Sequence, residues 1–259
     1  MKLLNKAIRR LVKRAGFDIV RTPRTGFGVD PFADMQRFVG PKKRPVIFDI
    51  GANVGQSADR FHGAFPSSCI HCFEPSPATF IELKKHCDEL PGVSVWNCGV
   101  GSCDTTLSFH ENEHSVMSSF LKLNDPAWGR VVGATDVKVI ALDSFARTQD
   151  IEFIHVLKSD TQGYEFEVFK GARQLMRENR IGLIYFEFIF SEMYADLPSF
   201  QDVFGFLSAN NFVLVTFYEL HFERELASWT DALFINRDYY RNRMKQGPAA
   251  DVPPGVSVL

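Results

Sequence analysis

Short runs of apolar residues alternate along this chain with longer stretches in which apolar residues recur three or four positions apart. The short runs are rich in Val, Ile and Phe, and the run 181–188 is apolar on both faces, as a buried parallel strand should be. The longer stretches are typical of amphipathic helices. The predicted strands are residues 45–49, 69–73, 93–96, 151–157, 181–188, 212–217 and 232–236. The predicted helices are residues 31–39, 55–63, 77–88, 164–179 and 198–209.

This alternation predicts an α/β fold built on one doubly wound, Rossmann-like sheet. Residues 99–141 interrupt the alternation, because their polar and apolar positions follow each other singly, as in antiparallel strands, around a polar loop. We therefore expect a β-rich insertion within a single domain of residues 45–240. The segment 241–259 ends the chain with a stretch rich in Pro, Gly and Ala, and we expect a disordered tail there.

Residues 1–44 are expected to form a basic helical extension. Before residue 25 the chain carries eight Lys and Arg residues against one acid, Asp18, and Leu4, Ile8 and Leu11 recur at helical spacing. Such a basic amphipathic helix is suited to peripheral contact with an anionic membrane or with a pyrophosphate-linked substrate; the alternative is a docked helix whose charges are solvated. No apolar run is long enough for a signal peptide or a membrane span, so we expect a cytoplasmic protein.

The overall charge gives no reason to expect a nucleic-acid partner. The 259 residues carry a formal net charge of −2, and the isoelectric point is near 6.4. Nucleic-acid binding favours a strongly basic face, and only the N-terminal extension offers a concentration of positive charge.

A glycine-rich turn follows the first predicted strand. That strand ends in Asp49, the turn reads Gly51-Ala-Asn53-Val-Gly55, and the second strand ends in Glu74. In nucleotide-binding βαβ units such a turn lets the backbone approach a ligand closely, and an acid about 20 residues on accepts hydrogen bonds from ribose hydroxyls. The spacing here is Gly-x-Asn-x-Gly and not the Gly-x-Gly-x-x-Gly of dinucleotide sites, which leaves open which nucleoside cofactor binds.

Polar side chains also end the five successive strands that are predicted to be parallel. Because the carboxyl ends of parallel strands meet at one edge of a sheet, this pattern predicts a ligand site at that edge. The residues at the strand ends are Asp49, Glu74, Asn97, Lys158 with Asp160, and Glu187.

All of these residues except Glu187 belong to segments that resemble FkbM-type S-adenosylmethionine-dependent methyltransferases, from about Val46 to Asn236. The resemblance implies a seven-stranded methyltransferase sheet whose last strand is antiparallel, and transfer of a methyl group, commonly to a hydroxyl of a sugar or natural product. The family usually has aliphatic residues where this chain has Ser159 and Thr161. The matching segments are DIGANVG (49–55), FEPSP (73–77), NCGV (97–100), the serine pair at 118–119, LD (142–143), KSDTQGYE (158–165), KGA (170–172) and DALF (231–234).

With S-adenosylmethionine as the cofactor, the glycine turn would hold the methionine carboxylate at a helix N-terminus. We expect backbone N–H groups of the turn and the side chains of Asn53 and Ser57 to be the donors. Glu74 would accept charge-assisted hydrogen bonds from both ribose hydroxyls, and Asn97 would border the adenine. The complete predicted cofactor site is Asp49, Gly51, Asn53, Gly55, Ser57, Glu74, Pro75, Asn97 and Ser119.

The predicted catalytic residues are Lys158, Asp160 and Glu187. Methyl transfer from a sulfonium is an in-line displacement that depends on positioning, and an alcohol acceptor must also lose a proton to a base. Lys158 and Asp160 are two apart on a strand, so both project to one face. Asp160 either orients the methionine amino group or takes the proton, and Lys158 either is the base or holds Asp160; a purely structural ion pair is the alternative. Glu165 is expected only to complement a helix dipole.

Several alternatives stay open. Either of two loop histidines, His110 and His114, is an alternative base, and no compact ligand motif points to a metal. A dinucleotide enzyme would need a third glycine, a nucleic-acid methyltransferase would need a basic, aromatic groove, and a non-catalytic cofactor-binding module would not need the acids. We expect an O-methyltransferase that acts on a saccharide hydroxyl in glycan or natural-product biosynthesis, with a small-molecule or saccharide acceptor.

Overall fold

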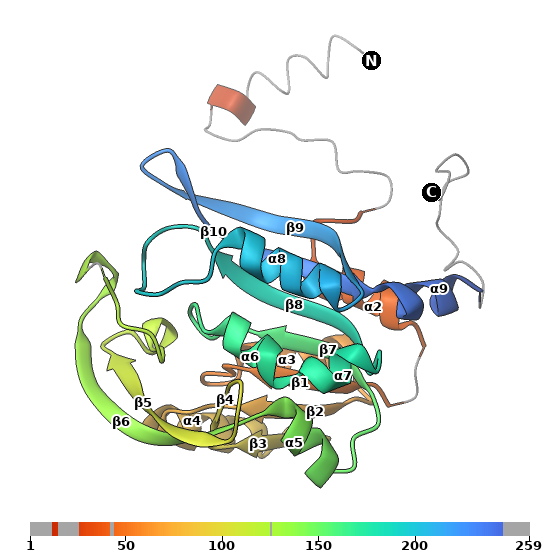
Figure 1. Cartoon of the computed structure of the whole chain (residues 1–259), viewed down its shortest axis with the longest axis horizontal. Coiled ribbons are helices and arrows are strands. Elements are labelled where there is room, and N and C mark those ends of the chain that lie inside the picture. Colours follow the sequence, from red (N-terminus) through yellow and green to blue (C-terminus); the bar gives the residue numbers. More distant parts are fainter. Residues whose placement is uncertain (1–11, 15–25, 42–43, 125, 246–259) are drawn as a thin grey trace.

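A computed structural model describes residues 12–14, 26–41, 44–124 and 126–245. Within them a seven-stranded sheet has the order β3-β2-β1-β7-β8-β10-β9 (Figure 1). The first five strands in this order are parallel to one another, and β10 pairs antiparallel with both of its neighbours. The predicted doubly wound sheet with an antiparallel last strand is thereby confirmed. The strands are β1 Val46–Ile50, β2 Cys69–Phe73, β3 Val93–Trp96, β7 Ile154–Ser159, β8 Ile181–Ile189, β9 Phe212–Glu223 and β10 Leu226–Asn236.

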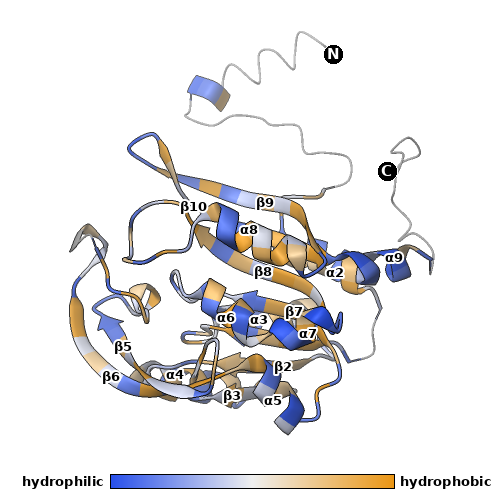
Figure 2. Ribbon diagram, viewed as in Figure 1, coloured by the Kyte–Doolittle hydropathy of each residue, from blue (hydrophilic) through white to orange (hydrophobic). Residues whose placement is uncertain are grey.

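Helices cover both faces of the sheet, because successive residues of its strands point to opposite sides. Ile47 of β1 packs with Phe61 and Leu83 in one core cluster, whereas the next residue, Phe48, packs with Phe169 in the other. Figure 2 shows how strongly apolar the central strand β8 is. The helices are α2 Pro31–Val39, α3 Gln56–Ala64, α4 Pro77–Cys87, α5 Leu142–Thr148, α6 Glu165–Gly171, α7 Arg173–Arg177, α8 Phe200–Ala209 and α9 Arg237–Lys245.

Three boundaries differ from the predictions. The helix expected over 164–179 is divided into α6 and α7 next to Gly171, where a Cβ atom would overlap the carbonyl oxygen of Gly101. The last two strands are much longer than 212–217 and 232–236, because they continue as a hairpin that turns at Arg224 and Glu225, both with positive φ. Helix α9 reaches Lys245, so the first residues of the predicted tail are helical.

The β-rich insertion is confirmed as a small second sheet with the order β4-β6-β5. Its strands are β4 Gly99–Val100, β5 Thr105–Asn112 and β6 Val131–Ile140, and β5 and β6 pair antiparallel. Two 3₁₀ turns, η1 Ser115–Met117 and η2 Pro126–Trp128, lie in the connection between β5 and β6. Figure 1 shows the arc of β5 and β6 beside the carboxyl ends of the central strands.

The predicted helix 31–39 is confirmed as α2, whose N-cap Asp30 accepts a hydrogen bond from the backbone of Phe32. The ring of Phe32 lies 4.8 Å from that of Phe61, which fixes α2 on α3. The basic helix predicted before residue 25 lies outside the described residues except for 12–14, which are helical. The tail beyond Lys245 also lies outside them. Among the described helices, none has the length and apolar character that crossing a membrane requires.

Candidate active site

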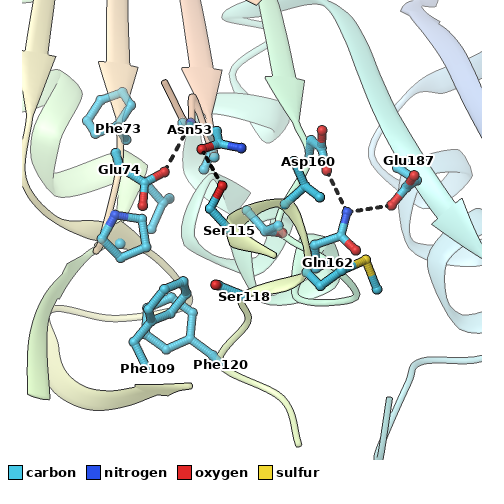
Figure 3. Close-up of a pocket in the computed structure, with 18 of the residues that line it drawn as sticks. Asn53, Phe73, Glu74, Phe109, Ser115, Ser118, Phe120, Asp160, Gln162 and Glu187 are labelled. Carbon is cyan, nitrogen blue, oxygen red and sulfur yellow. Dashed lines mark hydrogen bonds between the residues drawn. The ribbon is translucent and has the colours of Figure 1, made fainter. Parts of the chain in front are cut away.

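A cavity of about 290 Å³ opens at the carboxyl ends of β1, β2, β7 and β8, and the connection between β5 and β6 covers part of it. Figure 3 shows that Glu74 and Glu187 lie at opposite sides of this cavity, with Asn53, Ser115 and Asp160 between them. Its walls combine a few polar groups with many apolar ones, as small-molecule sites do. We call it the central cavity.

The glycine turn after β1 forms one edge of the central cavity. Gly51 has a φ of 71°, and a Cβ atom there would overlap the carbonyl oxygen of Asp160, so only glycine fits. Gly55 is the N-cap of α3 and supplies no side-chain acceptor to the first turn. Backbone N–H groups at that helix end are therefore oriented for an anion. Gly51 and Asn53 line the cavity, whereas Gly55 is buried and does not line it.

Glu74 is held rigidly at the end of β2. One carboxylate oxygen accepts from the backbone N–H of Asn53 at 3.0 Å, and the other accepts from that of Ser76 at 2.9 Å. Burial raises the pKa of Glu74 to about 7, although these two hydrogen bonds act in the opposite direction. The carboxyl group lines the central cavity, where its remaining lone pairs can accept two vicinal hydroxyls.

The Glu74 end of the cavity has mainly apolar walls, formed by Phe73, Phe109 and Phe120 (Figure 3). Pro75, the residue after Glu74, also lines the cavity. Flat apolar walls of this kind suit a purine ring. Phe73 and Pro75 follow from the β2 motif, whereas Phe109 and Phe120 come from the insertion and carry no motif in the sequence.

Two predicted cofactor residues support the backbone around the cavity without lining it. The side-chain amide of Asn97 donates to the carbonyl oxygens of Glu74 and Pro75, at 2.9 and 3.2 Å. Ser119 is only 1% exposed and donates to the carbonyl oxygen of Gln162. Neither side chain lines the central cavity, because each is turned to the backbone that it holds; Ser118 lines it in place of Ser119.

Asp49 also differs from its predicted role. Its carboxylate is fully buried, pairs with Lys158 at 2.9 Å and accepts from the hydroxyl of Ser57 at 2.8 Å. The Nζ atom of Lys158 in addition donates to the carbonyl oxygen of Gly51 at 3.0 Å. This buried network fixes the glycine turn on β7, and the carboxylate of Asp49, fully buried, does not line the central cavity.

Lys158 is not placed to act as a base. Burial alone would lower its pKa, but the negative charges of Asp49 and Asp160 outweigh burial and raise the pKa above its ordinary value. The ammonium group therefore keeps its proton. Of the two roles predicted for Lys158, the geometry favours the ion pair, since its Nζ atom also lies 3.8 Å from Asp160.

Asp160 and Glu187 are joined by a residue that the sequence did not single out. The amide nitrogen of Gln162 donates to Asp160 at 3.0 Å and to Glu187 at 2.9 Å (Figure 3). The amide oxygen of Gln162 accepts from the hydroxyl of Tyr194 at 3.1 Å, which fixes the orientation of the amide. Gln162 has a φ of 55°, and nothing in the pattern of the chain predicts that bend.

The two carboxyl groups differ in their surroundings. The side chain of Asp160 is 45% exposed. Burial, with the nearby carboxylates of Asp160, Glu165 and Asp231, raises the pKa of Glu187 well above its ordinary value. Glu165 begins α6 as predicted, but it faces inward, and its carboxylate accepts from both the backbone and the hydroxyl of Thr161.

Trp128, Met193 and Trp229 also line the central cavity. Among the described residues that line it, three carry carboxyl groups and none is Lys, Arg or His, so His110 and His114 are not part of its wall. No group of three potential metal ligands occurs in the described part of the chain.

A seven-stranded sheet of this order, with a glycine turn and a carboxylate at the ends of its first two strands, defines the Rossmann-like class of methyltransferases. The chain belongs to the family described as the Methyltransferase FkbM domain, whose model matches residues 49–214, more than half of the chain. It is therefore a methyltransferase whose cofactor is S-adenosylmethionine.

Two characterised proteins show the similarity at the level of sequence. The 2-O-methyltransferase NoeI of Sinorhizobium fredii is 26% identical over 186 residues, which cover 64% of this chain and 76% of that protein. The hexuronic acid methyltransferase AglP of Haloferax volcanii is 25% identical over 135 residues, which cover 51% of this chain and 52% of that protein.

Solved structures are similar at lower identity. A TehB-like SAM-dependent methyltransferase from Corynebacterium glutamicum is 13% identical, with a TM-score of 0.41, and the match covers 90% of this chain and 97% of that one. TrmK of M. capricolum, solved with S-adenosyl-homocysteine, is 9% identical, with a TM-score of 0.44, over 79% of this chain and 68% of that one.

The central cavity fits S-adenosylmethionine in its charge and in its polar groups. The sulfonium and ammonium groups of this cofactor exceed its single carboxylate, so its net charge is positive, and the cavity wall offers carboxyl groups without cations. The glycine turn, with the N-terminus of α3, suits the methionine carboxylate, and Glu74 with its aromatic neighbours suits the nucleoside.

Proposed function

We propose that the chain is an O-methyltransferase that acts on a hydroxyl group of a saccharide. The observation that carries this proposal is the pair of carboxyl groups, Asp160 and Glu187, that Gln162 bridges at the end of the cavity away from Glu74. A hydroxyl acceptor must lose a proton, and this pair supplies a base beside the cofactor position. NoeI is a 2-O-methyltransferase, which supports O-methylation, and AglP is a hexuronic acid methyltransferase, which supports a sugar acceptor.

Each part of the cofactor has a proposed partner. Glu74 accepts hydrogen bonds from the two ribose hydroxyls, and Pro75 with the neighbouring aromatic rings encloses the adenine. The turn from Gly51 to Asn53 and the N-terminus of α3 hold the methionine carboxylate. Asp160, partly exposed and beside Gly51, orients the ammonium group.

Glu187 is the proposed general base. When bound, S-adenosylmethionine supplies an electrophilic methyl group, so that a C–O bond forms as the S–C bond breaks. The acceptor proton passes to the carboxylate of Glu187, whose raised pKa makes it a stronger base than an ordinary carboxylate. Gln162 fixes the direction of that carboxylate, because its amide is itself held by Tyr194.

The test is transfer of a tritiated methyl group from S-adenosylmethionine to a panel of methyl glycosides. We expect label in at least one glycoside, as an ether that resists mild alkali, and loss of that label in a Glu187→Gln variant that still binds the cofactor. Label that mild alkali releases would indicate a carboxylate acceptor and contradict O-methylation of a hydroxyl. Cofactor binding without transfer to any glycoside would contradict a saccharide acceptor.

A further inference from the structure

Two indole rings meet at the wall of the central cavity. Trp128 lies in η2, in the connection of the insertion, and Trp229 lies on β10, yet their ring centroids are 5.6 Å apart and their planes cross at 85°. Both rings line the cavity and both are only partly buried. They form a perpendicular corner, which we call the tryptophan corner.

The pairing of β10 with β8 places this corner at the Glu187 side of the cavity. Asp231 is paired with Glu187, and Trp229, two residues before Asp231, is paired with Ile189, two residues after Glu187. Residues two apart on a strand point to the same face, so Trp229 and Glu187 share a face of the sheet. Ile189 and Met193 form a small cluster against which both indoles pack. Because Ile189 is two residues after Glu187 on β8, this cluster places the corner next to Glu187.

One face of Trp229 is already covered. The ring of His221 stacks on it, with centroids 4.5 Å apart and planes at 11°. His221 and Trp128 cover part of the Trp229 indole, and the remaining surface of this indole lines the cavity. An indole exposed at a cavity wall gains by covering its apolar surface, and the C–H face of a pyranose ring is a flat apolar surface of matching size.

The charged residues around the central cavity restrict the charge that the acceptor sugar can carry. None of the described residues lining the central cavity is Lys, Arg or His. Lys158 and Arg60 line an adjoining cavity, where Lys158 is paired with Asp49 at 2.9 Å and Arg60 with Asp30 at 3.4 Å. Arg130, two residues beyond Trp128, is paired with Glu113 at 3.3 Å. A carboxylate on the acceptor would lie near Glu187 without a cationic side chain of the cavity wall to balance it, whereas neutral hydroxyls can donate to that group.

We propose that the tryptophan corner is the acceptor subsite and that it takes an uncharged pyranoside and rejects a uronate. This rests on the proposed saccharide acceptor, and it adds both the surface that binds the sugar and the charge that the sugar must have. The pyranose ring stacks in the corner of Trp128 and Trp229, and one of its hydroxyls donates to Glu187. In this respect the chain differs from its relative AglP, a hexuronic acid methyltransferase by name.

Tryptophan fluorescence tests this without requiring turnover, because the chain has three tryptophans and two of them form the corner. The protein is saturated with S-adenosylhomocysteine and titrated with the methyl glycosides of glucose and galactose, and with those of glucuronic and galacturonic acid. We expect saturable quenching by at least one neutral glycoside, with a Kd about tenfold lower than that of its uronic acid counterpart.

Substitutions of individual tryptophans test whether the fluorescence quenching arises at the tryptophan corner. Trp229→Leu and Trp128→Leu should each raise the Kd of the glycoside about tenfold and leave that of S-adenosylhomocysteine unchanged. Trp229→Phe keeps an aromatic surface and should retain most of the affinity, so it reports on stacking even where the leucine variant does not fold. Trp96→Phe is the matched control, since Trp96 packs on Phe145 away from the cavity, and it should preserve both the quenching and the Kd.

The outcomes separate this inference from the proposed function. Equal or tighter binding of the uronates, unchanged affinity in the leucine variants, or no saturable quenching by any glycoside would each overturn the subsite. Methyl transfer to a glycoside with full activity in the leucine variants would leave the proposed function standing and remove the subsite. Selective quenching by neutral glycosides without methyl transfer would support the subsite and contradict the proposed function.

Discussion

The Nζ atom of Lys158 lies 2.9 Å from Oδ1 of Asp49, and both side chains are almost completely withdrawn from water. Their pairing joins β7 to β1 at the point where the glycine turn begins. Removing one partner of such a pair leaves an uncompensated buried charge. We expect Lys158→Met to lower the free energy of unfolding by about 3–5 kcal/mol, as measured by urea denaturation.

Two variants make that test specific. Lys170→Met removes a partly exposed ion pair with Glu167 and should cost no more than about 1 kcal/mol. In the double variant Asp49→Asn/Lys158→Met neither charge is left unpaired, so we expect it to recover part of the lost stability. Additive losses in the double variant would show that the two side chains do not stabilise each other.

The pH dependence of methyl transfer should report on Glu187. A base acts only when deprotonated, so kcat/KM should fall as the pH is lowered through the raised pKa of this carboxyl, well above its ordinary 4.5. Glu187→Gln should lower kcat by about 100-fold or more and abolish this acidic limb. The measurement is a pH–rate profile with a saccharide acceptor.

Glu192→Gln makes the same change of charge at an exposed position a few residues beyond β8. It should leave the rate and the profile unchanged. An acidic limb that persists in Glu187→Gln would assign the base to another group, with Asp160 the nearest carboxylate, since it shares the amide of Gln162.

Glu165 should make the fold less stable as the pH rises. Burial raises its pKa from 4.5 to about 7 in the folded state. The folded protein therefore holds this proton more tightly than the unfolded chain does. The resulting stability is complete below pH 4.5 and is lost as the pH rises through about 7.

Denaturation at pH 5 and at pH 8 measures this effect. The loss of unfolding free energy between these pH values should be about 2–3 kcal/mol smaller in Glu165→Gln than in the parent protein. A glutamine can still accept the hydrogen bonds from Thr161. Glu167→Gln, on the same helix but 30% exposed, is the control and should keep the parental dependence. An equal loss of unfolding free energy in the parent protein and both variants would show that ionising Glu165 does not destabilise the fold.

The chain's pattern predicts the sheet well, because buried parallel strands are continuous apolar runs and the polar residues that end them are conspicuous. Glu74, Asp160 and Glu187 all line the cavity as expected from their positions at strand ends. The structural roles of Asp49 and Ser119 could not be predicted from the sequence pattern. Whether a polar side chain at such an edge faces a ligand or a buried partner depends on residues far away in the sequence, such as Lys158 for Asp49.

Gln162 and Trp229 show what the pattern omits. Gln162 bridges two carboxyl groups only because its backbone adopts a left-handed conformation, and a single polar residue carries no signal of that bend. Trp229 lies in the part of β10 that extends beyond the predicted strand 232–236. Its neighbour Trp128 comes from the insertion, so the corner exists only in three dimensions.

Cofactor affinity should itself depend on pH. An ionised Glu74 can accept both ribose hydroxyls, whereas a protonated one must donate, and burial raises its pKa to about 7. The affinity for S-adenosylmethionine should therefore weaken as the pH falls below about 7, as measured by calorimetric titration between pH 5.5 and 8.5. Glu74→Gln should bind weakly and without that dependence.

The most direct test of the whole account is calorimetric titration of Glu74→Ala with S-adenosylmethionine at pH 8. The site described here predicts tight binding by the parent protein and a loss of about 1–3 kcal/mol in the variant. Glu82→Ala, an exposed acid on α4, should bind as the parent protein does. Equal affinity in Glu74→Ala and the parent protein, or no binding by either, would contradict the assignment of this cavity to the cofactor.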